Sequence, residues 1–214
     1  MTKKTDSQKQ DYYLELIIDQ LRSRVRTLEK EKLELEQTLL SAQEQITIDG
    51  LTEVKNRQGF NLALTHEISQ LPAAYDLRKI TSKSLGLLMI DADFFKHVND
   101  RYGHEVGDQV LVTIARVLKK SVRTSDEVCR WGGEEFAIIL PGINELGITE
   151  VGEKIRAAVA ELIFYDHEDL RISVSIGGAV QRHQSDTALF DRADAALFSA
   201  KNNGRNRVIV ADTD

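Results

Sequence analysis

Acidic side chains stand at the ends of two short apolar segments. Asp91 and Asp93 directly follow the apolar run 85–90, and Glu134 and Glu135 follow a Gly-Gly pair and precede a second apolar run. A buried strand holds the carboxylates at its end rigidly, and such oxygens can bind Mg²⁺ that is shared with substrate phosphates. The alternatives are two solvated loop aspartates and a charged shoulder on an edge strand.

The glutamate pair lies in a predicted hairpin. Residues 126–131 and 135–141 are strand-like, and Gly132 and Gly133 between them are typical of a tight turn. Their missing side chains would let a ligand approach the backbone. Because neighbouring strand residues face opposite sides, we expect one of Glu134 and Glu135 to face the aspartates.

Composition and motifs argue against several classes of protein and of binding site. The 214 residues carry a net charge of −6, which gives no sign of a nucleic-acid surface, and no apolar run approaches the ~20 residues that span a bilayer. The single Cys129 excludes an intrachain disulfide, and the N-terminus lacks the apolar region of a secretory signal. We therefore expect a cytoplasmic protein. The sequence contains no P-loop, dinucleotide fingerprint or serine elbow, and its five histidines lack zinc-like spacing.

The elements that must position these acids alternate between helix and strand. Helices are expected at 60–69, 104–122, 148–163 and 186–203, and strands at 85–90, 126–131, 135–141, 170–180 and 206–211. This order indicates an α/β domain that begins at residue 49 and ends at residue 214.

Residues 12–48 form a separate segment without Gly or Pro. Apolar residues recur at heptad spacing, with Ile18, Val25, Lys32, Leu39 and Ile46 at a and Leu14, Leu21, Leu28, Leu35 and Ala42 at d. β-Branched residues at a with Leu at d favour a parallel two-stranded coil, so we predict a homodimer through residues 12–48 of a coiled-coil domain 1–48. The alternative is one amphipathic helix packed on its own domain. Asp49-Gly50 is a turn signal, and we expect a pliable hinge there.

Six segments together resemble the GGDEF-domain diguanylate cyclase family. In order they are DGLTEVKNR, DADFFKHVNDRYGHEVGD, RWGGEEF, SVSIG, RADAALFSAK and GRNRV, and the resemblance extends from about Asp49 to Val210. Glu53 and Lys55 stand where the family usually has Gly and Pro, and Phe198 replaces a usual Tyr. The resemblance implies a nucleotidyl-cyclase-like, ferredoxin-like palm, in which helices flank a mixed or antiparallel central sheet.

The same resemblance implies a reaction. The family condenses two GTP molecules into cyclic di-GMP and releases two pyrophosphates. Metal would bind the Asp91 and Glu134 carboxylates and the Ala92 carbonyl, as two Mg²⁺ per half-site with Mn²⁺ as a substitute. Glu135 would stabilise the reacting centre or help to activate the 3′-hydroxyl, so Asp91, Glu134 and Glu135 are the implied catalytic residues.

Substrate and product contacts are implied as well. Asn99 and Asp108 would read guanine, and the phosphates would meet Lys96, His104, Lys201, Arg205 and the backbone of Phe94 and Phe95. Arg123 and Asp126 form an R-x-x-D string at the family's product-inhibition position, where both could bond guanine. The alternative for this string is a solvated loop.

One such domain would bind one GTP, so turnover would need two domains, and the coil would raise the effective concentration of the second. Two other functions stay open at this point. A catalytically inactive domain could sense GTP or cyclic di-GMP, and the coil could make the chain a dimerising scaffold. Incubation with GTP and Mg²⁺, with detection of pyrophosphate, separates an enzyme from both.

Overall fold

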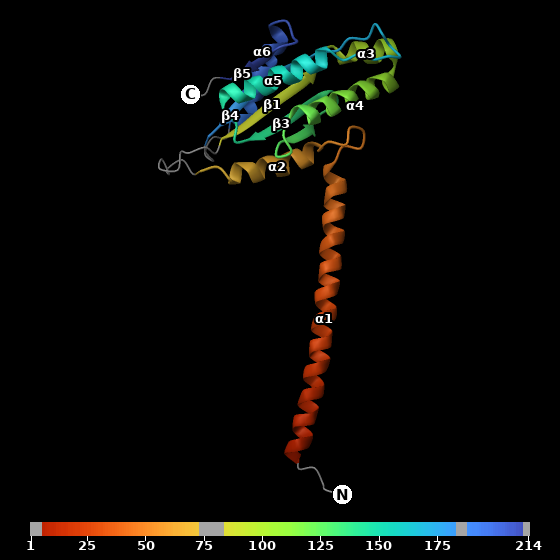
Figure 1. Ribbon diagram of the computed structural model, residues 1–214, viewed down its shortest axis with the longest axis vertical. Helices are drawn as coiled ribbons and strands as arrows, with labels where there is room; N and C mark the ends of the chain where they lie inside the picture. Colours follow the sequence, from red (N-terminus) through yellow and green to blue (C-terminus); the bar gives the residue numbers. More distant parts are fainter. Residues whose placement is uncertain (1–5, 73–83, 183–187, 212–214) are drawn as a thin grey trace. The chain divides into compact units, whose positions relative to one another are not determined.

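The computed structural model describes residues 6–72, 84–182 and 188–211 (Figure 1). The chain divides into two compact units, Met1–Ile46 and Thr47–Asp214. The helices are α1 (Asp6–Thr47), α2 (Arg57–Ser69), α3 (Phe95–Tyr102), α4 (His104–Ser121), α5 (Glu145–Ala160) and α6 (Leu189–Asn202). The strands are β1 (Leu85–Ala92), β2 (Glu127–Arg130), β3 (Glu135–Pro141), β4 (Val174–Gln181) and β5 (Val208–Val210).

The second unit is built on a five-stranded sheet of order β2-β3-β1-β4-β5. The pairs among β2, β3, β1 and β4 are antiparallel, and β5 joins β4 in parallel. Helices separate β1 from β2 and β3 from β4, so the first four strands have the ferredoxin-like order 4-1-3-2. The expected α/β fold, with a mixed sheet flanked by helices, is confirmed.

Both faces of the central strands are buried. Leu88 and Ile90 of β1 pack into a core with α3, α4 and α5, whereas Leu87 and Met89 pack into a second core with α2 and α6. Figure 1 shows these helices in layers on the two sides of the sheet. A strand buried on both faces reads as a continuous apolar run rather than an alternating one, which is the pattern seen at 85–90.

One helix of the structure was not expected, and two expected elements have different or undescribed starts. The eight-residue helix α3 was not predicted, because most of its residues are polar and only Phe95 and Val98 are buried in it. Residues 170–173 precede β4 instead of opening it, although the Ser173 carbonyl still accepts a hydrogen bond from the Asp93 N–H (2.9 Å). Residues 186 and 187 of the last expected helix lie outside the described residues.

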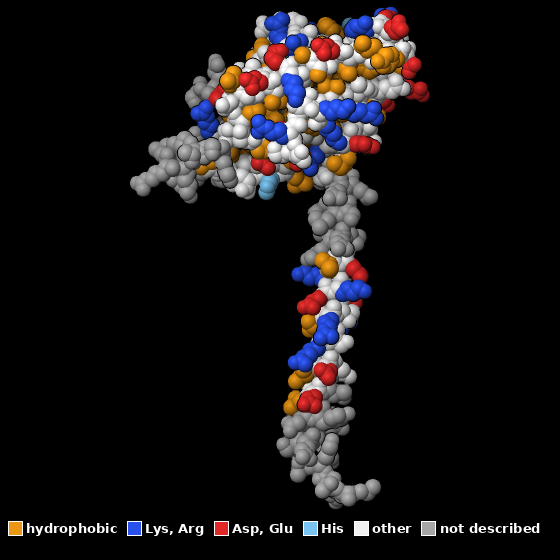
Figure 2. Space-filling model, in the orientation of Figure 1, with side chains coloured by type: hydrophobic (Ala, Val, Ile, Leu, Met, Phe, Trp, Pro, Cys, Tyr) orange, Lys and Arg blue, Asp and Glu red, His pale blue; other side chains and the backbone are white. Residues whose placement is uncertain are grey.

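The helix α1 carries exposed apolar side chains. Seven side chains of the predicted seam are 45–71% exposed, namely Leu14, Ile18, Leu21, Val25, Leu28, Leu35 and Ile46. Figure 2 shows hydrophobic side chains along the described part of this helix. The side chains of Leu39 and Ala42 are outside the description, and coil pairing stays a prediction. Among the described residues, no helix combines the length and apolarity needed to cross a membrane.

The turn after α1 is tied into the second unit. The Thr47 carbonyl accepts a hydrogen bond from the Asn56 N–H (2.8 Å), and Ile48 forms a bridge with Lys55. The Asp49 carboxylate accepts bonds from the N–H and hydroxyl of Thr52 (2.9 and 2.6 Å). These bonds hold Asp49 in its turn, and a pliable hinge at this residue stays a prediction.

Glu53 in this turn has a left-handed backbone, with φ +56° and an exposed side chain. A left-handed conformation costs a side-chain-bearing residue about 1–2 kcal/mol, and Gly avoids that cost while losing about 0.5–1 kcal/mol of chain entropy. We therefore expect Glu53→Gly to raise the free energy of unfolding by up to about 1 kcal/mol, and Glu53→Val to lower it. Urea unfolding of both variants checks this, and a Gly variant less stable than the parent would contradict it.

Candidate active site

The register of the sheet brings the acidic residues of the two motifs to one end. Asp91 in β1 pairs with Glu135 in β3, and the Ala92 N–H donates to the Glu134 carbonyl (3.2 Å). Asp91 in β1 and Glu134 directly before β3 thus lie at the same end of neighbouring strands although they are 43 positions apart in the sequence.

The Gly-Gly turn joins β2 to β3 by bonds to one carbonyl. The N–H groups of Trp131 and Gly132 both donate to the Glu135 carbonyl (2.8 and 3.3 Å). Neither Gly132 nor Gly133 has a positive φ, so the turn does not require the left-handed freedom of glycine. A Cβ at Gly133 would meet no atom within 4 Å, so the space beside this residue is open.

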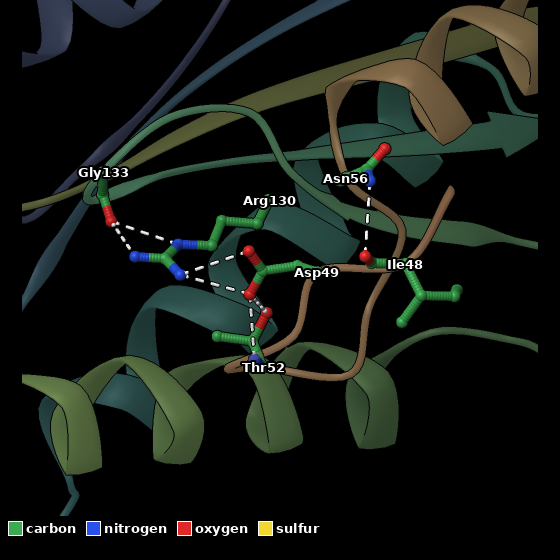
Figure 3. A network of polar contacts seen from close by, with 6 residues as sticks. All are labelled: Ile48, Asp49, Thr52, Asn56, Arg130 and Gly133. Carbon is green, nitrogen blue, oxygen red and sulfur yellow. Dashed lines mark hydrogen bonds and ion pairs between the residues drawn. The ribbon is translucent and has the colours of Figure 1, made fainter. Parts of the chain in front are cut away.

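The Arg130 guanidinium holds the Gly-Gly turn through the Gly133 carbonyl (Figure 3). Its Nη2 and Nε donate to the Gly133 carbonyl (2.7 and 3.2 Å), while Nη1 lies 3.1 and 3.3 Å from the two carboxylate oxygens of Asp49. Burial raises the pKa of Asp49, but the bonds from Thr52 and Arg130 outweigh it and bring this pKa below its ordinary value. One guanidinium therefore connects the turn after α1 to the turn that bears Glu134.

The carboxylates of Asp91 and Glu134 lie close enough to each other and to Lys201 for their charges to interact. Asp91 is 7% exposed, and Lys201 Nζ lies 2.7 Å from its Oδ2. Burial raises the pKa of Asp91 despite the opposing charge of Lys201. Burial also raises the pKa of Glu134, and the negative charge of Asp91 adds to this effect. A further cation at this position would stabilise both carboxylates in their charged form.

The donor set suits a hard divalent cation. Asp91 and Glu134 offer carboxylate oxygens, and Ala92, the last residue of β1, offers a carbonyl. In the described part of the chain, no cluster of three or more His, Cys, Asp or Glu side chains could hold a metal. Such a sparse set fits Mg²⁺, which usually takes one or two protein carboxylates and completes its shell with water and substrate phosphates.

The start of α3 offers backbone donors beside these acids. Phe94, the residue before the helix, is left-handed (φ +56°) and gives no side-chain cap, and the first turn contains no acid. The first N–H groups of a helix lack partners inside it and carry partial positive charge, which favours a phosphate. Phe95 is 6% exposed and anchors the helix in the core, while Lys96 is exposed in the first turn.

The two cations near the C-terminus lie at the same end of the sheet. Lys201 meets Asp91 as described, and the Arg205 guanidinium lies 4.5 Å from the ring centroid of Phe94. The Phe94 ring in turn stacks on His97, with 5.6 Å between the ring centroids. Lys201 is thus ion-paired with Asp91, a residue that is also an expected metal ligand.

Asn99, one of the two expected guanine readers, lies against Gly107, the residue before the other, Asp108. Gly107 is buried in the first turns of α4, and a Cβ there would overlap the Asn99 amide oxygen. The missing side chain lets Asn99 of α3 lie against α4 next to Asp108, which is exposed. His104 is the first residue of α4 and is exposed.

The R-x-x-D string lies in the turn between α4 and β2. Its turn is closed by the Arg123 N–H, which donates to Asp126 Oδ2 (2.8 Å), and by the Asp126 N–H, which donates to the Arg123 carbonyl (3.1 Å). Both side chains line a cavity of about 290 Å³ that Glu150 and Lys154 of α5 also line. Neither Lys154 nor Arg130 was predicted from the sequence, because Ser121 and Asp49, which they contact, are distant from them in the chain.

Comparison with known proteins agrees with this arrangement. Residues 46–207 match the family described as diguanylate cyclase, GGDEF domain. The chain is 36% identical over 171 residues to diguanylate cyclase A of Treponema denticola, covering 78% of this chain and 45% of that protein. It is 39% identical over 182 residues to diguanylate cyclase DgcM of Escherichia coli K12, covering 85% of this chain and 42% of that protein. The chain thus spans less than half the length of these two relatives.

A solved structure extends the likeness to the first unit. The coiled coil and GGDEF domain of DgcB from Caulobacter crescentus, in complex with c-di-GMP, superposes with a TM-score of 0.73 at 31% identity. The match covers 89% of this chain and 99% of that one. On the family match, the sequence identities and the shared fold, this chain belongs to the GGDEF-domain diguanylate cyclase family.

Proposed function

We propose that this chain is a diguanylate cyclase that condenses two GTP molecules into cyclic di-GMP. The observation that carries the proposal is the meeting of Asp91 and Glu134 at adjacent strand ends, next to the uncapped N-terminus of α3. Paired carboxylates for a cation beside donors for phosphate are what phosphoryl transfer requires, because the reaction depends on positioning and on neutralising phosphate charge.

In this proposal each 3′-oxygen attacks the α-phosphorus of the other GTP. A new P–O bond forms, the bond to the β-phosphate oxygen breaks, and pyrophosphate leaves. Asp91, Ala92 and Glu134 would hold two Mg²⁺ ions, which supply Lewis acidity toward the phosphate oxygens when bound. Glu135, which pairs with Asp91 across the sheet, would assist deprotonation of the 3′-hydroxyl or stabilise the reacting centre.

Substrate orientation would come from two sets of contacts. Asp108 can accept hydrogen bonds from N1–H and the exocyclic amino group of guanine, and Asn99 beside it can bond the same edge. Adenine lacks that pair of donors, so ATP would leave a carboxylate unpaired. The triphosphate would meet the backbone at Phe94 and Phe95, with Lys96, His104, Lys201 and Arg205 around it.

A single domain would supply one half of the reaction centre. Two copies joined through α1 would complete it, and the exposed apolar side chains of that helix support such pairing. We further propose that cyclic di-GMP binds at Arg123 and Asp126 and slows turnover, with the Lys154 ammonium adding positive charge to the cavity.

The two adjacent glutamates should give different defects. We expect Glu134→Ala to lower the metal-dependent production of cyclic di-GMP by at least ~100-fold, about 2.7 kcal/mol of transition-state stabilisation, and to weaken metal binding. Glu135→Ala should lose turnover while GTP binding is largely kept. Product assays and calorimetric binding test both, with the exposed Glu161→Ala as control. If either variant works at the parent rate, the role assigned to that residue is wrong.

The coil should make activity independent of dilution. Leu21→Glu combined with Val25→Glu places charge on the predicted seam, so we expect low specific activity that rises with protein concentration. Ser23→Glu combined with Lys30→Glu adds the same side chains at outward positions and serves as the control. Activity at nanomolar protein is the measurement. Equal activity of seam and control variants at that concentration would remove the coil from the mechanism.

Product inhibition should depend on Arg123. Bidentate bonds from an arginine to guanine are typically worth ~1–3 kcal/mol, and each 1.4 kcal/mol is about tenfold in affinity. Arg123→Ala should therefore raise the inhibitory concentration of cyclic di-GMP by roughly tenfold or more with an unchanged initial rate, and Lys120→Ala should change neither. Progress curves with added cyclic di-GMP measure this, and identical inhibition of parent and Arg123→Ala would leave R-x-x-D as a loop without this role.

A further inference from the structure

Asp93 is a buried acid that the proposed chemistry does not use. It lies two residues after Asp91 and is 3% exposed. Its carboxylate accepts three hydrogen bonds, from the hydroxyls of Ser173 and Ser175 (2.6 Å each) and from the backbone N–H of Asn206 (3.0 Å). A charged group is buried only when it is well paired, so these three donors are what allow an aspartate at this position.

The three bonds connect separate parts of the site. Ser173 directly precedes β4 and Ser175 is its second residue, and Asn206 belongs to segment 203–207, which links α6 to β5. Asp93 itself follows the end of β1 and directly precedes Phe94. One carboxylate therefore fixes the end of β1 against segment 203–207, which carries Arg205.

Segment 203–207 has a backbone that needs such support. Arg205 and Asn206 have φ of +61° and +44°, a left-handed region that side-chain-bearing residues rarely occupy. The Arg205 N–H donates to the Ala200 carbonyl (3.1 Å), and the next N–H, that of Asn206, donates to Asp93. The backbone on both sides of the Arg205 side chain is thus held, and strained conformations persist where neighbouring structure fixes them.

The Asp93 carboxylate helps to position both partners of a cation–π contact, Phe94 and Arg205. Phe94 is placed by its position next to Asp93 in the chain, and Arg205 is placed through Asn206. The Arg205 guanidinium then lies 4.5 Å from the Phe94 ring centroid, beside the N-terminus of α3. Without the bond to Asp93, segment 203–207 would keep the bonds from Arg156 to the Asn206 side chain (3.0 Å) and from the Ile176 N–H to the Arg207 carbonyl (2.9 Å), but the backbone next to the Arg205 side chain would lose one of its two bonds.

We propose that Asp93 is a positioning residue for the triphosphate: by holding the Asn206 N–H it sets Arg205 against Phe94 at the start of α3. This inference rests on the proposed function, because it assigns Arg205 to the phosphates of GTP. In this role Asp93 neither binds a metal ion nor transfers a proton. The role requires only that Asp93 accept hydrogen bonds, so charge itself is dispensable.

Two substitutions separate this role from others. In Asp93→Asn the amide oxygen can take the position of Oδ2 and keep the bonds from Ser173 and Asn206, while its NH₂ group faces the Ser175 hydroxyl, which can turn to accept. In Asp93→Ser the hydroxyl can bond a neighbouring serine but is one bond shorter and does not reach the Asn206 N–H. Asp100→Asn and Asp100→Ser, in the exposed part of the same motif, are matched controls.

The experiment measures binding rather than turnover. Affinities for a non-hydrolysable GTP analogue and for guanosine are determined by calorimetry with Mg²⁺ on the full chain, and folding is checked by thermal melting. We expect Asp93→Ser to weaken the analogue at least about tenfold, as when one charge-assisted phosphate contact is lost, and to leave guanosine within about twofold. Asp93→Asn should bind both like the parent, and Arg205→Ala should remove most of the effect of Asp93→Ser.

Three outcomes would overturn the inference. Equal losses for analogue and guanosine in Asp93→Ser would indicate a general structural role. A loss in folded Asp93→Asn as large as in Asp93→Ser would indicate that the charge matters, and this arm decides the question even if Asp93→Ser does not fold. Additive effects of Asp93→Ser and Arg205→Ala would separate the two residues. A parent chain that does not bind the analogue would instead refute the proposed function.

Discussion

The site depends on the register of β1 between β3 and β4. Asp91 lies opposite Glu135 on one side and Ser175 on the other, so one strand sets the position of the acids of the proposed metal site and of the serines that donate to Asp93. This register is strongly specified because alternate residues of β1 enter different cores. A slip of one residue would exchange the two sets of side chains and leave both cores mispacked.

Burying a carboxylate at the end of a strand costs free energy, and the two buried acids here, Asp91 and Asp93, are stabilised by different kinds of partner. Asp91 is paired with Lys201, which lies at the last turn of α6, where a cation also suits the helix C-terminus. Asp93 is instead stabilised by hydrogen bonds from uncharged donors. Asp91 is therefore paired with a side-chain cation, whereas the hydrogen-bonding capacity of Asp93 is used by uncharged groups of the protein.

The sequence predicted most of what local pattern encodes. The apolar runs located β1 and β3, and the family segments named Asp91, Glu134, Asn99 and Asp108. It could not predict α3, whose eight residues bury few apolar side chains, or the left-handed backbone at Arg205 and Asn206, which tertiary bonds maintain. It also missed the role of Gly107, because a glycine that makes room for Asn99 looks like any other helical glycine until the two helices are placed.

Arg130 shows why some roles need an arginine and three-dimensional information together. Its planar guanidinium contacts the Asp49 carboxylate and the Gly133 carbonyl with different nitrogens. A lysine has one ammonium and could not span both partners in a fixed geometry. Since Asp49 is also held by Thr52, and Thr47 at the end of α1 by Asn56, the turn after the helix and the Gly-Gly turn belong to one bonded network. A displacement of the turn after α1 would therefore have to break or carry with it the bond to Gly133, one residue before the Glu134 that the proposed chemistry needs.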